Sequence, residues 1–216
     1  MLMNLGLYPV LFKRQVVSAT VLSASSTGPT IVIPASAAAG DLAVLCDYAW
    51  KTLGSGDPGD VVPTGWTGLI TDYDGDHARI RCSYKVLVGG DPGATVTGMN
   101  STEEDKVMFV FRPSQSIVTV TPSTWLADAT GGDPASQAIS ASGQATPIIV
   151  IGCAVARNNT VEFSTESPAF DAKVANSDAN MLVGYKIYNT APADHTVDMN
   201  DYVASNALAS GYLKMG

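Results

Sequence analysis

The chain has 216 residues, of which 46% are hydrophobic and only 15% are charged, and its formal net charge is −8. This length can bury a sizeable core, in one large all-β domain or in two small domains. The negative charge disfavours nucleic acid and anionic membrane surfaces as partners, because both would repel the protein.

An apolar run opens the chain at residues 1–12 and is followed by Lys13 and Arg14. The run is too short to span a bilayer, so we expect no membrane insertion. A secretory signal places its basic residues before the apolar segment, and here the order is reversed. Residues 1–14 are therefore interpreted as an arm that pairs with its own chain or a neighbouring one, with a frayed terminus as the alternative.

Short β-strands are predicted along the rest of the chain, with almost no helical periodicity. The clearest is residues 80–88, where apolar side chains alternate with Arg81, Ser83 and Lys85 in the period of two of a half-buried strand. Its basic residues are expected to face solvent. The other predicted strands are residues 16–22, 30–33, 42–48, 68–71, 94–97, 107–111, 118–120, 137–139, 148–155, 160–163, 181–188, 196–199 and 211–215. Gly- and Pro-rich turns separate them, which predicts one jelly-roll-like β-sandwich over residues 15–216.

Internal similarity gives the organisation of this sandwich. The tripeptide at residues 84–86, Tyr-Lys-Val, recurs as Tyr-Lys-Ile at 185–187, and residues 42–46 align with 149–153. The long Gly/Asp/Pro loop after Trp50 shrinks to residues 157–159 in the second copy. The pattern predicts two related four-stranded halves, about residues 30–113 and 145–216, that complete one domain by crossing strands between them. Tyr84 and Tyr185 are expected to be equivalent inward residues.

The order of local motifs in the first half resembles a class of bacteriophage and prophage virion surface proteins. The motifs are Gly40-Asp41-Leu42 opening a strand, Pro63-Thr64-Gly65-Trp66, Tyr84-Lys85-Val86, Gly90-Asp91-Pro92 and Phe111-Arg112-Pro113. The resemblance is good over residues 30–113 and weak over 145–216. This chain has Asp91 where the class usually has Glu, and its second half lacks the Gly-Trp step.

What this resemblance implies is a jelly-roll-like sandwich found on tail fibres, head decorations and other surface appendages. The chain would then be a non-enzymatic structural protein of a phage-like virion, assembled in the host cytoplasm and displayed at the particle surface. Its partners would be other virion proteins, copies of itself in a homo-oligomer, and a host surface glycan. The matching motifs are turn and core residues, so they carry no catalytic residue with them.

Three cysteines, Cys46, Cys82 and Cys153, lie in apolar strand-like runs without a CxxC pair. Such residues behave as small hydrophobic side chains, so we expect buried free thiols and folding in a reducing compartment.

Candidate ligand-binding residues lie around the first long loops. Asp72, Asp74 and Asp76 are close enough in sequence to bind a cation such as Ca²⁺ through carboxylate oxygens. The favoured alternative is a hairpin tip, in which Asp74-Gly75 supplies the positive φ angles of a tight turn. Trp50 starts the long loop and is the best candidate for stacking on a sugar ring, although packing is favoured for it and for the other two tryptophans. Together these four residues define the alternative function, a carbohydrate-binding module for a cell-surface polysaccharide.

Catalytic motifs are absent from the sequence. Asp194-His195 lacks a partner serine in a GxSxG turn, and no phosphate loop, HExxH or dinucleotide fingerprint occurs. The acidic run at residues 103–105 is interpreted as a solvated turn that keeps charge at a strand edge. We therefore expect no enzymatic activity, no cofactor and no metal site.

Overall fold

The structure is a computed structural model that describes residues 16–52, 54–59, 61–75, 78–97, 103–117, 119–129, 134–156, 160–200 and 206–216. The predicted arm, residues 1–14, lies outside the described residues. Regular structure in the described part is entirely β, with sixteen strands and no helix, so the all-β prediction is confirmed. That part therefore contains no helix long and apolar enough to cross a membrane.

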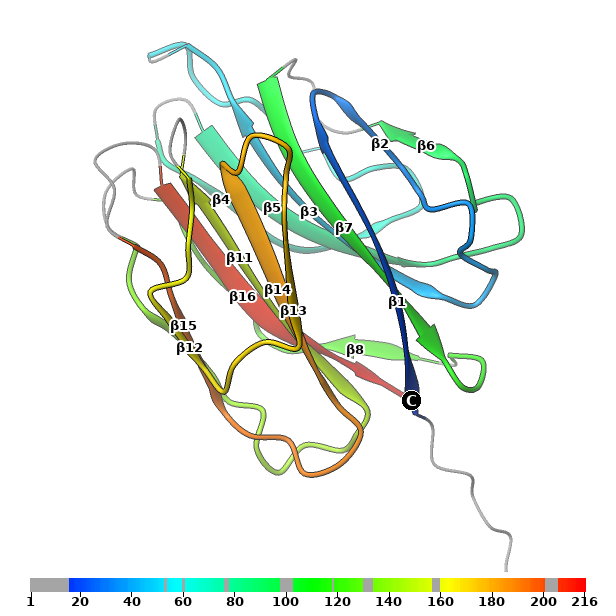
Figure 1. Cartoon of the computed structure of the whole chain (residues 1–216). Coiled ribbons are helices and arrows are strands. Elements are labelled where there is room, and N and C mark those ends of the chain that lie inside the picture. The colour runs from blue at the N-terminus through cyan, green and yellow to red at the C-terminus, as the bar shows by residue number, and fades with distance from the viewer. Residues whose placement is uncertain are drawn as a thin grey trace, which may run out of the picture.

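Two large antiparallel sheets form the body of the molecule (Figure 1). The strand order of the first is β1 (Val17–Thr27), β7 (Glu103–Pro113), β3 (Leu42–Trp50), β5 (Ala78–Val86) and β4 (Thr67–Tyr73). The strand order of the second is β13 (Ala172–Ala175), β14 (Met181–Tyr188), β11 (Ile148–Ala156), β16 (Asn206–Met215) and β8 (Val120–Pro122). The short β9 (Leu126–Asp128) also pairs with β16.

Two small sheets lie outside the large ones, with the large sheets between them (Figure 1). The first pairs β2 (Thr30–Val32) with β6 (Thr95–Thr97), and the second has the order β10 (Gln137–Ile139), β15 (His195–Asp198) and β12 (Thr165–Ser167). A central apolar core draws on both large sheets, and two further cores lie beneath the small ones. The protein is therefore a two-sheet sandwich with a partial cover on each outer face.

The two large sheets have equivalent strand orders. The sequence β7-β3-β5-β4 in the first sheet corresponds to β16-β11-β14-β13 in the second, and β2 and β6 correspond to β10 and β15. The registers agree as well, since Val44 lies opposite Tyr84 and Ile151 lies opposite Tyr185. Residues that the internal similarity aligns therefore occupy equivalent ladder positions.

Both tyrosines point into the central core, as predicted. The Tyr185 ring lies edge-on to two phenylalanines of the facing sheet, with centroid distances of 4.8 Å to Phe109 and 5.2 Å to Phe111. Such edge-to-face contacts add to the free energy gained from burial alone. The aromatic contact thus joins the two sheets near the middle of the sandwich.

Two predictions about the halves are wrong. Each large sheet has five strands in its main path rather than four, and its strands all come from one half of the described chain, with no crossing between halves. The extra strands are the edge strands β1 and β8, which lie in the sequence before residues 30–113 and before residues 145–216, respectively. With these edges added, each half completes its own sheet and needs no strand from the other.

The strand predicted at residues 160–163 is also absent, and β9, β12 and β13 were not predicted. The amide of Val161 donates to the carbonyl of Ala179, and ladder pairing begins only at Thr165. These segments are three or four residues long and partly exposed, so tertiary contacts rather than local pattern decide their conformation.

Candidate functional site

The predicted ligand residues lie together at one end of the first sheet. Trp50 is the last residue of β3 and lies opposite Ala78, the first residue of β5. Asp72 lies in β4 and Asp74 follows it in the hairpin to β5, so the structure places these three residues at one end of the sheet, with β5 between β3 and β4. Asp76 lies outside the described residues.

The two described carboxylates bind backbone amides. Asp74 Oδ1 accepts a hydrogen bond from the amide of Ala78 at 3.0 Å, and Gly75 has a φ of +85°. This geometry is that of the hairpin tip, in which glycine allows the positive φ. Asp72 Oδ2 accepts from the amide of Ala129 at 2.9 Å and so ties β4 to the segment after β9. Within the described ranges, no group of three or more His, Cys, Asp or Glu residues is placed to hold a metal ion.

The tryptophans make packing contacts. Trp50 is half-buried against the central core, and its ring centroid lies 5.6 Å from that of Tyr48. Trp125 is buried, and its ring lies where a Cβ on Gly211 would be, within 2.5 Å of the indole. A glycine at position 211 therefore lets this indole fill the central core. The geometry matches the packing role that the sequence favoured.

A row of buried charges that sequence reasoning missed crosses the outer face of the first sheet. Arg81 of β5, Asp47 of β3 and Lys106 of β7 lie directly opposite one another in the ladder. Their exposed fractions are only 2%, 1% and 0%, respectively. The prediction that Arg81 faces solvent is therefore wrong. Its alternation with apolar residues was read correctly, but the loop segment that carries Val62 and Pro63 lies over this face.

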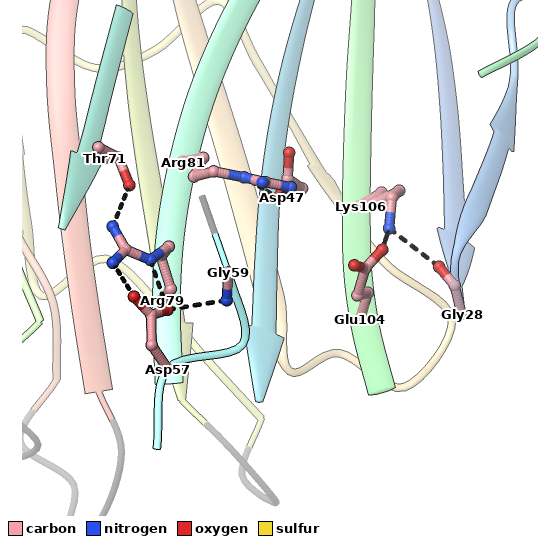
Figure 2. A network of polar contacts seen from close by, with 9 residues as sticks. All are labelled: Gly28, Asp47, Asp57, Gly59, Thr71, Arg79, Arg81, Glu104 and Lys106. Atoms are coloured by element: carbon pink, nitrogen blue, oxygen red, sulfur yellow. Dashed lines mark hydrogen bonds and ion pairs between the residues drawn. The ribbon is translucent and has the colours of Figure 1, made fainter. Parts of the chain in front are cut away.

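Each charge in the row has a partner (Figure 2). Arg81 donates from Nε and Nη2 to Asp47 Oδ1, at 3.0 and 2.8 Å. Lys106 Nζ forms an ion pair with Glu104 and donates to the carbonyl of Gly28 at 3.0 Å. Burial raises the pKa of Asp47 to about 6, although the charge of Arg81 lowers it. The Arg81–Asp47 ion pair therefore lies in a buried environment that disfavours charge.

The acidic run at residues 103–105 is part of β7, not a solvated turn, so that prediction is wrong. Glu104 and Asp105 are both buried. Asp105 accepts a hydrogen bond of 2.5 Å from Nδ2 of Asn176, which belongs to the second half. Burial raises the pKa of Asp105 to about 6, while this hydrogen bond lowers it. Asp105 therefore serves as a polar contact between the halves.

Arg79 fastens the long loop to the sheet (Figure 2). Its Nε donates to Asp57 Oδ1 at 2.9 Å, and its Nη1 donates to Thr71 Oγ1 at 2.7 Å. Asp57 also accepts from the amide of Gly59 at 2.8 Å. These hydrogen bonds, that from Arg79 above all, lower the pKa of Asp57. The guanidinium lies 5.3 Å from the ring centroid of Tyr73, so the loop is held on one side of the hairpin.

The three cysteines are free and buried in the central core, as the sequence predicted. Cys46 and Cys82 lie opposite each other on β3 and β5, with a sulfur–sulfur distance of 3.2 Å. Cys153 occupies the position in β11 that Cys46 occupies in β3. Burial raises the pKa of Cys82 and Cys153, which keeps these groups as neutral thiols.

Asp194 and His195 do not form a catalytic pair. The carboxylate of Asp194 accepts from the amide of Ser142 at 2.8 Å, whereas Nε2 of His195 lies 2.7 Å from the hydroxyl of Tyr188. His195 is buried, and burial lowers its pKa to about 4. A histidine held neutral in this way acts as a polar member of the core beneath β10, β15 and β12.

Fold and site together define an all-β, two-sheet sandwich protein with buried ion pairs on one outer face. No protein-family model, curated protein or solved structure matches the chain.

Proposed function

We propose that this chain is a non-enzymatic structural protein of a phage-like virion, with a jelly-roll-like sandwich displayed at the particle surface. It acts as a decoration, spike or tail-fibre component. It assembles in the host cytoplasm as a homo-oligomer beside other virion proteins. In this proposal the two pseudo-repeats form one domain, and residues 1–14 are an arm that pairs with its own chain or with a neighbouring one.

One observation carries this proposal together with the motif resemblance: two sheets of equivalent strand order share a single apolar core. The described residues thereby build one two-layered block from one repeated plan. Blocks of this kind suit a repeated structural position on a particle. The apolar residues 1–12 add a segment that gains free energy when a neighbour covers it.

The use of the polar residues supports a non-enzymatic role. The carboxylates of Asp72 and Asp74 bind backbone amides, and His195 contacts Tyr188 inside a core. General acid–base catalysis needs such groups free to reach a substrate. In this protein they are used to hold turns and layers together.

Mass spectrometry of gradient-purified particles tests the proposal, with particles produced from the genome that encodes the chain. We expect the chain in the particle fraction at a constant ratio to the major capsid protein, and its absence from particles of a gene-deletion strain. An abundant cytoplasmic host protein serves as the contamination control. Recovery of the chain only at the level of that control would reject the virion role.

A carbohydrate-binding module is the second candidate, because the ladder places Trp50 beside the hairpin of Asp72 and Asp74. The candidate ligand residues are Trp50, Asp72, Asp74 and Asp76. A glycan array probed with the full chain, with Trp50→Ala and Asp74→Ala, and with the exposed-turn control Asp178→Ala tests this function. Binding that persists in the first two variants would rule out this site, and no binding at all would rule out the function.

A further inference from the structure

A cavity of about 240 Å³ lies on the outer face of the first sheet. Arg81 and Ser83 of β5 contribute to its lining, together with residues 68–71 of β4. Val62 and Pro63, from the long loop after β3, form another wall. Most of this lining is apolar, and the polar groups come chiefly from β5 and from Asp47 of β3.

Two polar atoms of these lining residues have no hydrogen-bond partner. They are Nη1 of Arg81 and Oγ of Ser83, and both residues are buried, with exposed fractions of 2%. Asp47 accepts hydrogen bonds from Nε and Nη2 of Arg81 but none from Nη1. An unpaired buried donor is costly, and native proteins leave few of them. These donors belong to residues that line the cavity, and a ligand oxygen that reached them would satisfy them.

The corresponding place in the second half is filled. Gly184 and Gly152 occupy the ladder positions of Ser83 and Leu45, and the ring of Phe170 lies against both glycines. A Cβ on Gly152 would come within 2.7 Å of this ring. The equivalent strands of the second sheet thus tolerate a filled site, so the cavity is a particular feature of the first sheet rather than a requirement of the fold.

The charges around the cavity favour an uncharged ligand. Asp47 neutralises Arg81, and on β7 Glu104 neutralises Lys106. Burial already raises the pKa of Asp47, so this region disfavours negative charge. A second anion beside Asp47 would add to that penalty, whereas a neutral oxygen would accept a hydrogen bond without it.

We propose that this cavity binds a small uncharged ligand with an apolar body and one carbonyl or hydroxyl oxygen, which accepts hydrogen bonds from Arg81 and Ser83. Its volume is below the roughly 300–1,000 Å³ of sites for drug-sized ligands, which limits the ligand to about one ring. The apolar body packs against Val62, Pro63 and Leu69. This binding site goes beyond the structural role proposed above and does not depend on where the protein is displayed.

Cyclohexanecarboxamide and cyclohexanecarboxylate form a matched pair of probes, equal in shape and different in charge. We expect saturable amide chemical-shift changes with the carboxamide at pH 7.5, confined to β4, β5 and residues 61–66 of the full chain. The carboxylate should bind at least about tenfold more weakly, because its charge is buried beside Asp47. No saturable shift with the carboxamide, shifts centred elsewhere, or equal affinity for both probes would each overturn the proposal.

Two variants assign the site. Ser83→Ala removes the free hydroxyl and should weaken binding about fivefold, the effect of one neutral hydrogen bond. The double variant Asp47→Ala/Arg81→Leu removes both charges together and should weaken binding at least about tenfold. The control Glu166→Gln/Lys173→Met removes an ion pair from the second half and should leave the affinity unchanged. Full affinity in the double variant, with its fold verified by the same spectra, would show that the ligand does not use Arg81.

Discussion

The outer faces of the two large sheets have the same ladder and different chemistry. In the first sheet, one row across β5, β3 and β7 reads Arg81, Asp47 and Lys106. The equivalent row across β14, β11 and β16 of the second sheet reads Leu182, Ala154 and Leu208. The strand order tolerates either row, so the fold alone does not decide what this face contains.

The cover over each row explains the difference. In the second half, β10, β15 and β12 form a small sheet whose apolar side chains pack on Ala154 and Leu208. In the first half, the described part of residues 51–66 contains no strand to match β12. A Gly- and Pro-rich loop presents less continuous apolar surface than a sheet. Charges paired with one another, and a cavity beside them, occupy the face that this loop covers.

The largest effect is expected when one charge of the row is left alone. Arg81→Leu removes the partner of buried Asp47 and should lower the free energy of unfolding by about 3–5 kcal/mol. The double variant Asp47→Ala/Arg81→Leu copies the second half and should lie within about 1 kcal/mol of the unmodified protein or above it. Urea unfolding of the three proteins measures both values. Equal losses in the single and double variants would mean that packing rather than charge dominates this row.

The converse change opens a space on the outer face of the second sheet. Phe170→Ala removes the ring that lies on Gly152 and Gly184 and should destabilise the protein by about 2–3 kcal/mol, less than a fully buried phenylalanine because the ring is partly exposed. Phe170→Leu, which keeps most of the volume, should cost less than half as much. Thermal unfolding compares the two, and similar losses would indicate that the aromatic ring itself, rather than the filled space, matters there.

Acidification should change the contributions of Asp47, in the first half, and His195, in the second half, to stability in opposite directions. The pKa of Asp47 is raised from 3.8 to about 6, so its contribution to stability is present below about pH 4 and is lost as the pH rises through 6. The pKa of His195 is lowered from 6.5 to about 4, so its contribution is present above about pH 6.5 and is lost as the pH falls through 4. The two groups thus have opposite slopes over the same window.

Unfolding free energies at pH 7 and pH 4 measure these slopes. The Asp47→Ala/Arg81→Leu variant should lose about 1–2 kcal/mol more than the unmodified protein on acidification, because it lacks the favourable protonation of Asp47. His195→Gln should lose about 1–2 kcal/mol less, because it lacks the unfavourable protonation of His195. Asp105 also has a raised pKa, but it is present in every protein compared and cancels. Parallel pH profiles for the three proteins would contradict both assignments.

The sequence predicted those features of the fold that the local residue pattern controls. Strands β10 and β14 have their predicted bounds because apolar runs with clear ends define them, and the aligned Tyr84 and Tyr185 share a ladder position. Edge strands such as β13 were not predicted, because their exposed side chains weaken the alternation of apolar and polar residues. The structure brings the predicted binding residues Trp50 and Asp74 to the same end of the first sheet, and their contacts depend on core packing and on the turn, respectively.

The burial of this row of charges could not be predicted from local pattern, for a different reason. Alternating basic residues such as Arg81 have the signature of a solvated face, but here Val62 and Pro63 of the long loop lie over that face. The contact between Asp105 and Asn176 joins residues 71 positions apart in different halves. Contacts of this kind arise from the fold as a whole, so one sequence without the structure does not reveal them.

The smallest effect is expected at the ion pair between Lys173 and Glu166, on the exposed edge of the second half. The Lys173 side chain is 41% exposed, compared with 3% for the Arg81 side chain. Water screens the pair and solvates either charge when its partner is removed, so Lys173→Met should change the free energy of unfolding by less than about 1 kcal/mol. Urea unfolding beside Arg81→Leu makes this a direct comparison of an exposed and a buried pair. A loss at Lys173 as large as that at Arg81 would mean that burial does not set the cost of an unpaired charge in this protein, and the contrast between the two outer faces would need another cause.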